Sequence, residues 1–275
     1  MNKEKPTIES LQAEINELNI IIVGLENTSK MLVRRDLDLK KAHNNLKSLD
    51  KEKTDFVAIA AHQLRTPLTT TMWAHKMFLE GDTGNLTSKQ KDLAERSFAS
   101  VKHMHALVEE LIQVDKLEYG NTELKIQSGN IQKLIETILA EHTLKIAEAN
   151  LTINKNYSYA EPISFDPYKL SDALGNLINN AVKYTPDNGK ISITIIKKAS
   201  NVYIEITDNG IGVPIGEESR LFHKFSRIKN AEQVDAGGSG LGLYIAKKII
   251  EKHKGTLTFS HNDGPGSTFT VKIPC

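Results

Sequence analysis

The sequence FVAIAAHQLRTPLT, at residues 56–69, predicts an amphipathic helix that carries one histidine. Its apolar side chains recur at the spacing of one helix face: Phe56, Ile59, Ala60, Leu64 and Leu68. His62 falls off this face, so we expect its imidazole to meet solvent. Pro67 lacks a backbone donor and is expected to kink the helix one turn beyond the histidine. A lone exposed histidine is more often inert than catalytic, so its interpretation depends on the rest of the chain.

Upstream of this stretch, leucines stand seven residues apart and predict a coiled coil. They are Leu11, Leu18, Leu25, Leu32, Leu39 and Leu46. Isoleucines flank only the first three, and Ser29, Asp36 and His43 take that position afterwards, so we expect the coiled coil to be weakest there. A long helix packed inside its own chain is the other interpretation. Residues 8–52 offer no such internal partner, which favours a parallel homodimer.

Downstream, Gly81–Asn85 supplies turn residues, and residues 88–118 predict a second helix capped by Thr87 or Ser88. Its expected apolar face contains Leu93, Ala94, Phe98, Val101, His105, Val108, Leu111, Ile112 and Val114. Two helices joined by a short turn form a hairpin, and two hairpins from a dimer form a four-helix bundle. His62 would lie on the outer surface of that bundle.

The composition is that of a globular protein: 39% of the 275 residues are hydrophobic and 25% are charged. A formal net charge of +1 gives no reason to expect a nucleic-acid or anionic-membrane partner. The single cysteine, Cys275, excludes an internal disulfide. No apolar run reaches the ~20 residues of a membrane helix. We therefore expect a cytoplasmic protein, or a piece of a longer one.

We predict three domains: a coiled-coil helix at 1–50, a helical hairpin at 51–119 and an α+β domain at 120–275. In the last domain, strands are expected at 124–126, 151–154, 190–197, 201–207, 256–260 and 267–273. Helices are expected at 131–148, capped by Asn130, and at 167–184 and 241–254. This order predicts helices packed on a mixed sheet.

Polar residues in NLINNAVKY, residues 176–184, share one face of a predicted helix. Asn176 and Asn180 offer amide oxygens, which suit Mg²⁺, and Lys183 suits a phosphate. This cluster is either a metal and nucleotide surface or an ordinary exposed polar face.

Two glycine-containing segments follow. In DNGIGVP, residues 208–214, Asp208 ends a predicted strand and can accept hydrogen bonds from the amine of a base, while Gly210 and Gly212 permit close backbone approach. In GGSGLGLYIA, residues 237–246, glycines precede a helix, where backbone amides and the helix dipole favour an anion. The glycine spacing fits neither the Rossmann fingerprint nor the P-loop.

Taken together, these motifs resemble those of the sensor histidine kinases. The His62 segment resembles that family's H box, and the N, G1, F and G2 boxes are matched in the same order by residues 176–184, 208–212, 221–225 and 238–242. The resemblance implies a dimerisation and histidine-phosphotransfer bundle followed by a Bergerat-type (GHKL) α/β sandwich, a fold shared with Hsp90-like ATPases. The coiled coil is similar to the signalling helices that feed such bundles.

The resemblance also implies roles for single residues. His62 would accept the phosphoryl group, Asn180 would bind Mg²⁺ and Asn176 would help to position the metal and the phosphates of ATP. Lys183 and Tyr184 would bind phosphate and nucleotide, and Asp208 would recognise the adenine amino group. The remaining residues implied in nucleotide binding are Gly210, Gly212, Phe222, Phe225, Arg227, Gly238, Gly240, Leu241 and Gly242.

Within that set, Gly210 and Gly212 would line the adenine pocket, and the later glycines would meet the phosphates. Residues 213–237 would form the ATP lid, anchored by Phe222 and Phe225, with Arg227 meeting the γ-phosphate.

The implied activity is ATP-dependent histidine phosphorylation. Neutral imidazole would attack the γ-phosphorus in line, and the phosphohistidine would then transfer its phosphoryl group to an aspartate of a separate response regulator. Thr66, one turn after His62, either orients water for phosphatase activity on that regulator or is a plain hydroxyl before Pro67.

Gln63 departs from the family pattern, in which the residue after the histidine is usually acidic. An amide accepts a hydrogen bond from the imidazole but cannot take its proton. We therefore expect slower autophosphorylation than an acidic residue would give.

Two other classes of function remain open. One is a scaffold that keeps the dimer and the ATP fold but transfers no phosphate, which only Gln63 favours. The other is a different Bergerat-fold ATPase, such as a chaperone or mismatch-repair protein, and the His62 hairpin argues against it.

Overall fold

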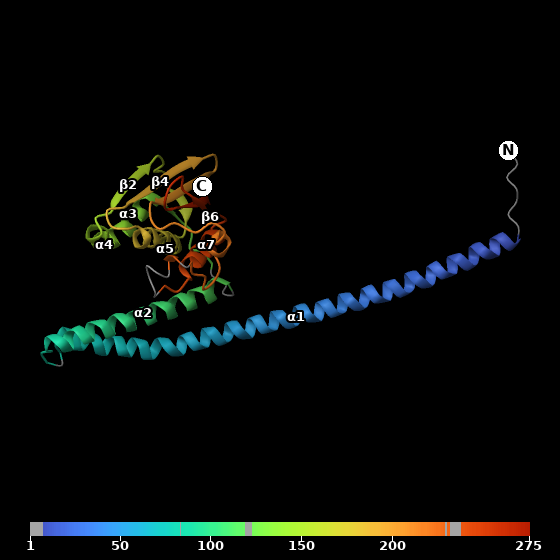
Figure 1. The fold of residues 1–275 in the computed structure, drawn as a ribbon, viewed down its shortest axis with the longest axis horizontal. Coiled ribbons are helices and arrows are strands. Elements are labelled where there is room, and N and C mark those ends of the chain that lie inside the picture. The colour runs from blue at the N-terminus through green and yellow to red at the C-terminus, as the bar shows by residue number, and fades with distance from the viewer. Residues whose placement is uncertain (1–7, 83, 119–122, 229, 232–237) are drawn as a thin grey trace. The chain divides into compact units, whose positions relative to one another are not determined.

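The computed structural model describes residues 8–82, 84–118, 123–228, 230–231 and 238–275 (Figure 1). The chain forms two compact units, residues 1–56 and 57–275. The finer division into 1–50, 51–119 and 120–275 stays a prediction. None of the helices in the described ranges has the length and hydropathy to cross a membrane.

Helix α1, Ile8–Glu80, begins in the first unit, where the predicted heptad lies. All the heptad leucines are exposed in the single chain: Leu11, Leu18, Leu25, Leu32, Leu39 and Leu46. The long N-terminal helix is thus confirmed. Pairing with a second chain stays a prediction.

In the second unit, α1 and α2, Ser88–Glu118, form the predicted hairpin. Thr87 caps α2 as expected. The N–H of Gln90 donates to Thr87 Oγ1 at 3.4 Å, and the N–H of Thr87 donates to Gln90 Oε1 at 2.9 Å. This reciprocal pair satisfies backbone donors that a helix start would otherwise leave open.

Two polar contacts fix which stripe of α1 faces α2. Arg65 Nε and Nη2 bind the two carboxylate oxygens of Glu109 at 2.5 and 2.9 Å, and His75 Nε2 lies 2.8 Å from Ser97 Oγ. Ala61 is fully buried on the same stripe. The hairpin is therefore held by one face of α1, centred near Ala61 and Arg65.

The predicted buried face was partly wrong. Ile59 is 63% exposed, Leu64 is 52% exposed, and on α2 Leu93 is 70% exposed. The side chain of Phe56 lies outside the described set. A single partner helix covers only one stripe of α1, so apolar residues to either side of that stripe remain at the surface. Helix α1 also continues through Pro67 to Glu80, so the proline does not end it.

The rest of the second unit is an α/β sandwich, as predicted. Its helices are α3 Ile131–Glu141, α4 Thr143–Glu148, α5 Pro167–Tyr184, the 3₁₀ turn η1 Glu218–Arg220 and α7 Gly242–Lys252. Its strands are β1 Gln127–Gly129, β2 Thr152–Tyr157, β3 Ile163–Phe165, β4 Lys190–Lys198, β5 Asn201–Asp208, β6 Thr256–His261 and β7 Ser267–Pro274.

The main sheet has the strand order β2-β4-β5-β7-β6, with only the β2–β4 pair parallel. Alternate residues of β4 and β5 are buried, and helices α3, α5 and α7 gather on one side of the sheet (Figure 1). Fully buried core residues include Ile193, Ile204, Leu174, Leu177 and Ile249. Each such side chain contributes about 1.5–3 kcal/mol by leaving water.

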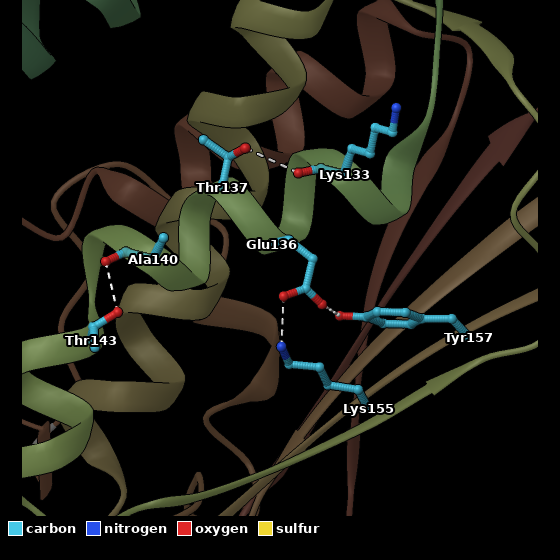
Figure 2. A network of polar contacts seen from close by, with 7 residues as sticks. All are labelled: Lys133, Glu136, Thr137, Ala140, Thr143, Lys155 and Tyr157. Atoms are coloured by element: carbon cyan, nitrogen blue, oxygen red, sulfur yellow. Dashed lines mark hydrogen bonds and ion pairs between the residues drawn. The ribbon is translucent and has the colours of Figure 1, made fainter.

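The helix expected over 131–148 breaks at His142. The N–H of His142 donates to Leu139 O at 3.0 Å, and Thr143 Oγ1 donates to Ala140 O at 2.8 Å, so the last carbonyls are satisfied without another helical turn (Figure 2). Asn130 caps α3 as predicted, because its Oδ1 accepts from the N–H of Lys133 at 3.0 Å.

A network around Glu136 fastens α3 to β2. Its carboxylate accepts from Lys155 Nζ at 2.6 Å and from the hydroxyl of Tyr157 at 3.1 Å (Figure 2). Burial and the Glu136 hydrogen bond together raise the pKa of Tyr157. The remaining differences from the prediction are small: the first strand lies at 127–129 rather than 124–126, and β3 was missed.

Candidate functional site

A cavity of about 480 Å³ lies beside α5, the end of β5 and the glycine segment before α7. It is lined by most of the residues that the sequence motifs singled out, although these are far apart in the chain. The predicted residues that line it are Asn176, Asn180, Lys183, Tyr184, Asp208, Gly212, Arg227, Gly238, Gly240 and Gly242. The fold therefore brings the three polar motifs into one site.

Helix α5 supplies the polar wall. Asp166 caps its start by accepting from the N–H groups of Tyr168 and Lys169 at 3.1 and 3.0 Å, and Pro167 occupies its first turn. The buried residues Leu174 and Leu177 fix one helix face in the core. Consequently the opposite face, with the asparagines and the lysine of the motif, lines the cavity.

The surroundings of Lys183 favour the binding of an anion. Burial lowers its pKa below the usual lysine value, and the charge of Arg227 lowers it further. A negatively charged ligand would relieve both effects, because it would offset the burial cost and separate the two cations electrostatically. The side of the cavity formed by α5 is therefore suited to binding phosphate.

Asp208 is a buried acid in the cavity lining. The residue is only 6% exposed at the end of β5, and its Oδ1 accepts from the N–H of Gly210 at 2.9 Å. Burial raises the pKa of Asp208, while backbone N–H groups of Gly210 and Ser267 oppose the rise. A buried carboxylate with acceptor capacity left over is suited to a neutral donor such as the amine of a base.

Gly240 shows why the loop before α7 is glycine-rich. Its φ is +71°, and a Cβ there would lie 2.7 Å from the carbonyl oxygen of Ser226. A side chain at this position would displace the lid backbone from the cavity wall.

Four of the residues predicted to bind the nucleotide do not line the cavity. Gly210 packs behind Asp208, where a Cβ would lie 2.3 Å from Tyr184 O. Phe222 meets Phe269 edge-on at 6.5 Å, and Leu241 is buried just before α7. Phe225 is 63% exposed, with a positive φ of 57°. Within the predicted lid, residues 229 and 232–237 lie outside the described part of the chain.

Several lining residues were given no site role in the sequence analysis. Apolar ones are Ile211, Val213, Leu221, Ile228, Leu243 and Phe269, and polar ones include Asn179, Ser226, Asn230, Ser239 and Ser267. Many lie within the motif stretches, between the residues that were singled out, and the apolar ones give no chemical signal of their own. Asn230 does have a visible role, because its Nδ2 donates to Gly212 O at 2.9 Å and ties the lid to the loop after β5.

Helix α2 also contributes to the lining, through His103, Ala106, Leu107 and Glu110. The carboxylate of Glu110 accepts a hydrogen bond from Ser239 in the glycine loop. Nothing in the sequence pattern of α2 predicted this contact, because it depends on how the hairpin packs against the sandwich.

His62, Gln63 and Thr66 lie on α1, and all three are exposed. The exposure of His62 is as predicted. None of the three lines the cavity, so the structure does not bring the histidine and the nucleotide motifs together. Exposure leaves His62 accessible to a partner or to a moving domain.

Comparisons with known proteins match both parts of the second unit. Residues 52–120 match the family described as the His Kinase A (phospho-acceptor) domain. Residues 165–275 match the family described as histidine kinase-, DNA gyrase B- and HSP90-like ATPase, which implies ATP binding.

The chain is 30% identical over 236 residues to the sensor protein kinase WalK of Staphylococcus aureus, covering 82% of this chain and 55% of WalK. It is 29% identical over 225 residues to the circadian input-output histidine kinase CikA of Synechococcus elongatus, covering 81% of this chain and 30% of CikA. The chain thus spans only part of each curated relative.

Among solved structures, the histidine kinase AdeS of Acinetobacter baumannii superposes with a TM-score of 0.57 at 26% identity, covering 78% of this chain and 97% of that one. Full-length ShkA in complex with AMPPNP gives a TM-score of 0.68 at 24% identity, covering 80% of this chain and 45% of that one. Because its sequence identity is only 24%, the match to ShkA supports the fold alone.

Proposed function

Since the chain belongs to the sensor histidine kinases, with a phospho-acceptor domain before an ATPase domain, we propose that it phosphorylates His62 from ATP. The phosphoryl group then passes to an aspartate of a response regulator. The phospho-acceptor hairpin is of the kind that is typically dimeric. We infer a homodimer as the working form.

The observation that carries this proposal is the polarity of the 480 Å³ cavity. The lining combines a buried acid, Asp208, with two cations, Lys183 and Arg227, which act on each other electrostatically, and with the glycine segment before α7. That combination suits a ligand that has both a neutral donor and several negative charges. ATP has this form, and the volume is within the range of about 300–1,000 Å³ for ligand pockets.

The residues also fit a Mg²⁺ ion. Asn176 and Asn180 both line the cavity with hard amide oxygens. Gly242 keeps the space beside Asn176 Oδ1 open, since a Cβ there would approach that oxygen to 3.2 Å. We propose that Asn180 binds the ion with Asn176 beside it. When bound, the ion would neutralise charge on the phosphates.

The chain's own residues then perform the transfer. A neutral ring nitrogen of His62 attacks the γ-phosphorus, the bond from that phosphorus to the bridging oxygen breaks, and ADP leaves. Lys183 and Arg227 offset negative charge, and Asp208 holds the base so that the triphosphate cannot slide. Gln63 can orient the imidazole by accepting a hydrogen bond, but an amide cannot take the proton, which must leave to water.

The exposure of Thr66 one turn beyond His62 supports a further role on the same face of α1. In this proposal its hydroxyl orients a water against a phosphorylated regulator. We propose that the protein also has phosphatase activity toward that regulator.

The test is incubation with γ-labelled ATP and Mg²⁺. Wild type should acquire an acid-labile, base-stable label, His62→Gln should acquire none, and Asp208→Asn should acquire little because it binds ATP poorly. Label retained in His62→Gln, or none in wild type, would remove the proposal. Circular dichroism of each variant separates loss of chemistry from loss of folding.

A further inference from the structure

We propose that Asn262, in the turn between β6 and β7, is a positioning residue for adenine recognition that acts through Asp208. The inference rests on the proposed function, in which Asp208 receives the adenine amino group. Asn262 is half-buried and is not part of the cavity lining. Its effect on the ligand must therefore pass through a neighbour.

The side chain of Asn262 joins the turn to the strand that carries Asp208. Its Nδ2 donates to the main-chain oxygen of Asp208 at 2.7 Å and more weakly to Pro265 O at 3.4 Å. Its Oδ1 accepts from Thr268 Oγ1 at 2.7 Å. One amide thus contacts the end of β5, the turn itself and the start of β7.

A second hydroxyl fixes the orientation of that amide. Thr268 Oγ1 lies 2.8 Å from Thr207 Oγ1, the residue before Asp208. Because the Thr268 proton goes to Asn262, Thr207 is the donor to Thr268. The relay runs from Thr207 through Thr268 to Asn262 and returns to the backbone of Asp208, closing a loop around the strand end.

These hydrogen bonds matter because the backbone of the β6–β7 turn is in close contact with the backbone at the end of β5. Gly266 has a φ of +106°, and a Cβ there would lie 1.9 Å from Asp208 O. Ser267, the next residue, is the register partner of Asp208, and its backbone N–H helps to lower the pKa of the Asp208 carboxylate. A shift of the turn would therefore move a donor that holds the carboxylate in place.

The two possible roles of Asn262, stabilising the turn and positioning Asp208, predict different outcomes when the side chain is removed. If Asn262 only stabilised the turn, its loss would weaken the binding of all nucleotides equally, or lower the melting temperature without changing the base preference. If it positions Asp208, its loss should affect only ligands that carry the 6-amino group. Inosine triphosphate has an oxygen at that position and the same ribose and triphosphate as ATP, so it serves as the probe.

The experiment measures Kd for ATP and for inosine triphosphate on the full chain, for wild type, Asn262→Ala and Thr268→Val. Wild type should prefer ATP. Asn262→Ala should weaken ATP binding by about tenfold, the scale of one lost hydrogen bond that orients another, and leave inosine triphosphate binding unchanged. Thr268→Val, a near-isosteric change, should shift the ratio in the same direction by a smaller factor.

Asn154→Ala on the edge strand β2 is the matched control, because Asn154 is exposed, and it should change neither affinity. Equal losses for both nucleotides in Asn262→Ala and Thr268→Val, or no loss in either variant, would overturn the role of Asn262. A wild type that fails to prefer ATP would instead overturn the assignment of Asp208 in the proposed function, and the present inference with it. Thr268→Val keeps the test decisive if Asn262→Ala does not fold.

Discussion

At the scale of single residues, the burial of Asp208 opposes its ionised form. Its carboxylate is buried at the end of β5, and burial raises its pKa above the usual aspartate value of 3.8. The folded state therefore holds a proton more tightly than the unfolded state does. The ionised carboxylate is a cost to folding that appears as the pH rises through this range, and the binding of a base donor offsets it.

This environment predicts the pH dependence of binding. Ionised Asp208 is the stronger acceptor for the adenine amine, since protonation removes its charge and turns one oxygen into a donor, so affinity weakens as the pH falls through the raised pKa. We expect the Kd for adenosine to rise on acidification at a pH above that of an ordinary aspartate. Isothermal titration between neutral and mildly acid pH checks this. An affinity that stays flat, or one that falls equally for Asp208→Asn, would contradict the assignment.

Gln63 gives the second prediction at this scale. Gln63→Glu places a proton acceptor beside His62 without changing the size of the side chain. Autophosphorylation should accelerate toward the roughly 10²-fold that a positioned general base contributes. Rapid-quench measurement at saturating ATP checks the rate, and Gln63→Met, which has neither amide nor carboxylate, should be slower than wild type. If Gln63→Glu matches wild type, the amide is not what limits the rate.

At the scale of elements, the contact of α2 with the glycine loop places a carboxylate inside the nucleotide cavity. Glu110 accepts from Ser239, and its charge acts on Lys183 in the same cavity. An incoming triphosphate would meet this negative charge. The docked hairpin is therefore expected to oppose ATP binding.

Glu110→Gln tests that expectation. Removing the charge should tighten ATP binding by up to about fivefold, the scale of a part-exposed charge interaction. Glu95→Gln is the matched control, since Glu95 is exposed on the same helix. The ATP affinities of wild type and both variants can be measured by equilibrium fluorescence. Weaker binding in Glu110→Gln would show that the carboxylate contributes to the site rather than opposing the ligand.

The elements also show what sequence can predict. Helix α5 was predicted with its correct ends because Asp166–Pro167 starts it and its apolar period is regular. The break at His142 was missed because Thr143 satisfies the carbonyl of Ala140 through its side chain, which periodicity does not register. Exposure of Ile59 and Leu64 was missed because spacing reveals an apolar stripe but not which surface covers it.

The same reasoning applies to the site. Asp208, Lys183 and the glycines were found because their chemistry and spacing are unusual. The apolar lining, such as Ile228 and Phe269, has no chemical signature, and Glu110 reaches the cavity only through packing between elements. The roles of individual residues stay predictions until nucleotide binding is measured.

At the scale of the whole molecule, exposed apolar residues on the hairpin indicate where a second protomer would pack. Leu64 and Phe78 are exposed and stand two heptads apart, so they share one face of α1. Trp73 is exposed eleven residues after His62, about three helical turns along, and lies on the histidine's side instead.

This difference predicts which substitution breaks the dimer. Leu64→Glu should yield monomers in light scattering coupled to size exclusion, because a charge would be buried at the bundle core. Trp73→Glu should remain dimeric. A dimer that survives Leu64→Glu, or one lost in Trp73→Glu, would place the interface elsewhere.

The most direct measurement is the position of the phosphoryl group after incubation with ATP and Mg²⁺. The hairpin also carries His75, His103 and His105, so the measurement must distinguish His62 from three other histidines. Tandem mass spectrometry of peptides kept at neutral to basic pH should find the phosphoryl group on His62 alone. Modification of another histidine, or an unmodified His62 in protein that binds ATP, would contradict phosphorylation of His62 from the α/β sandwich.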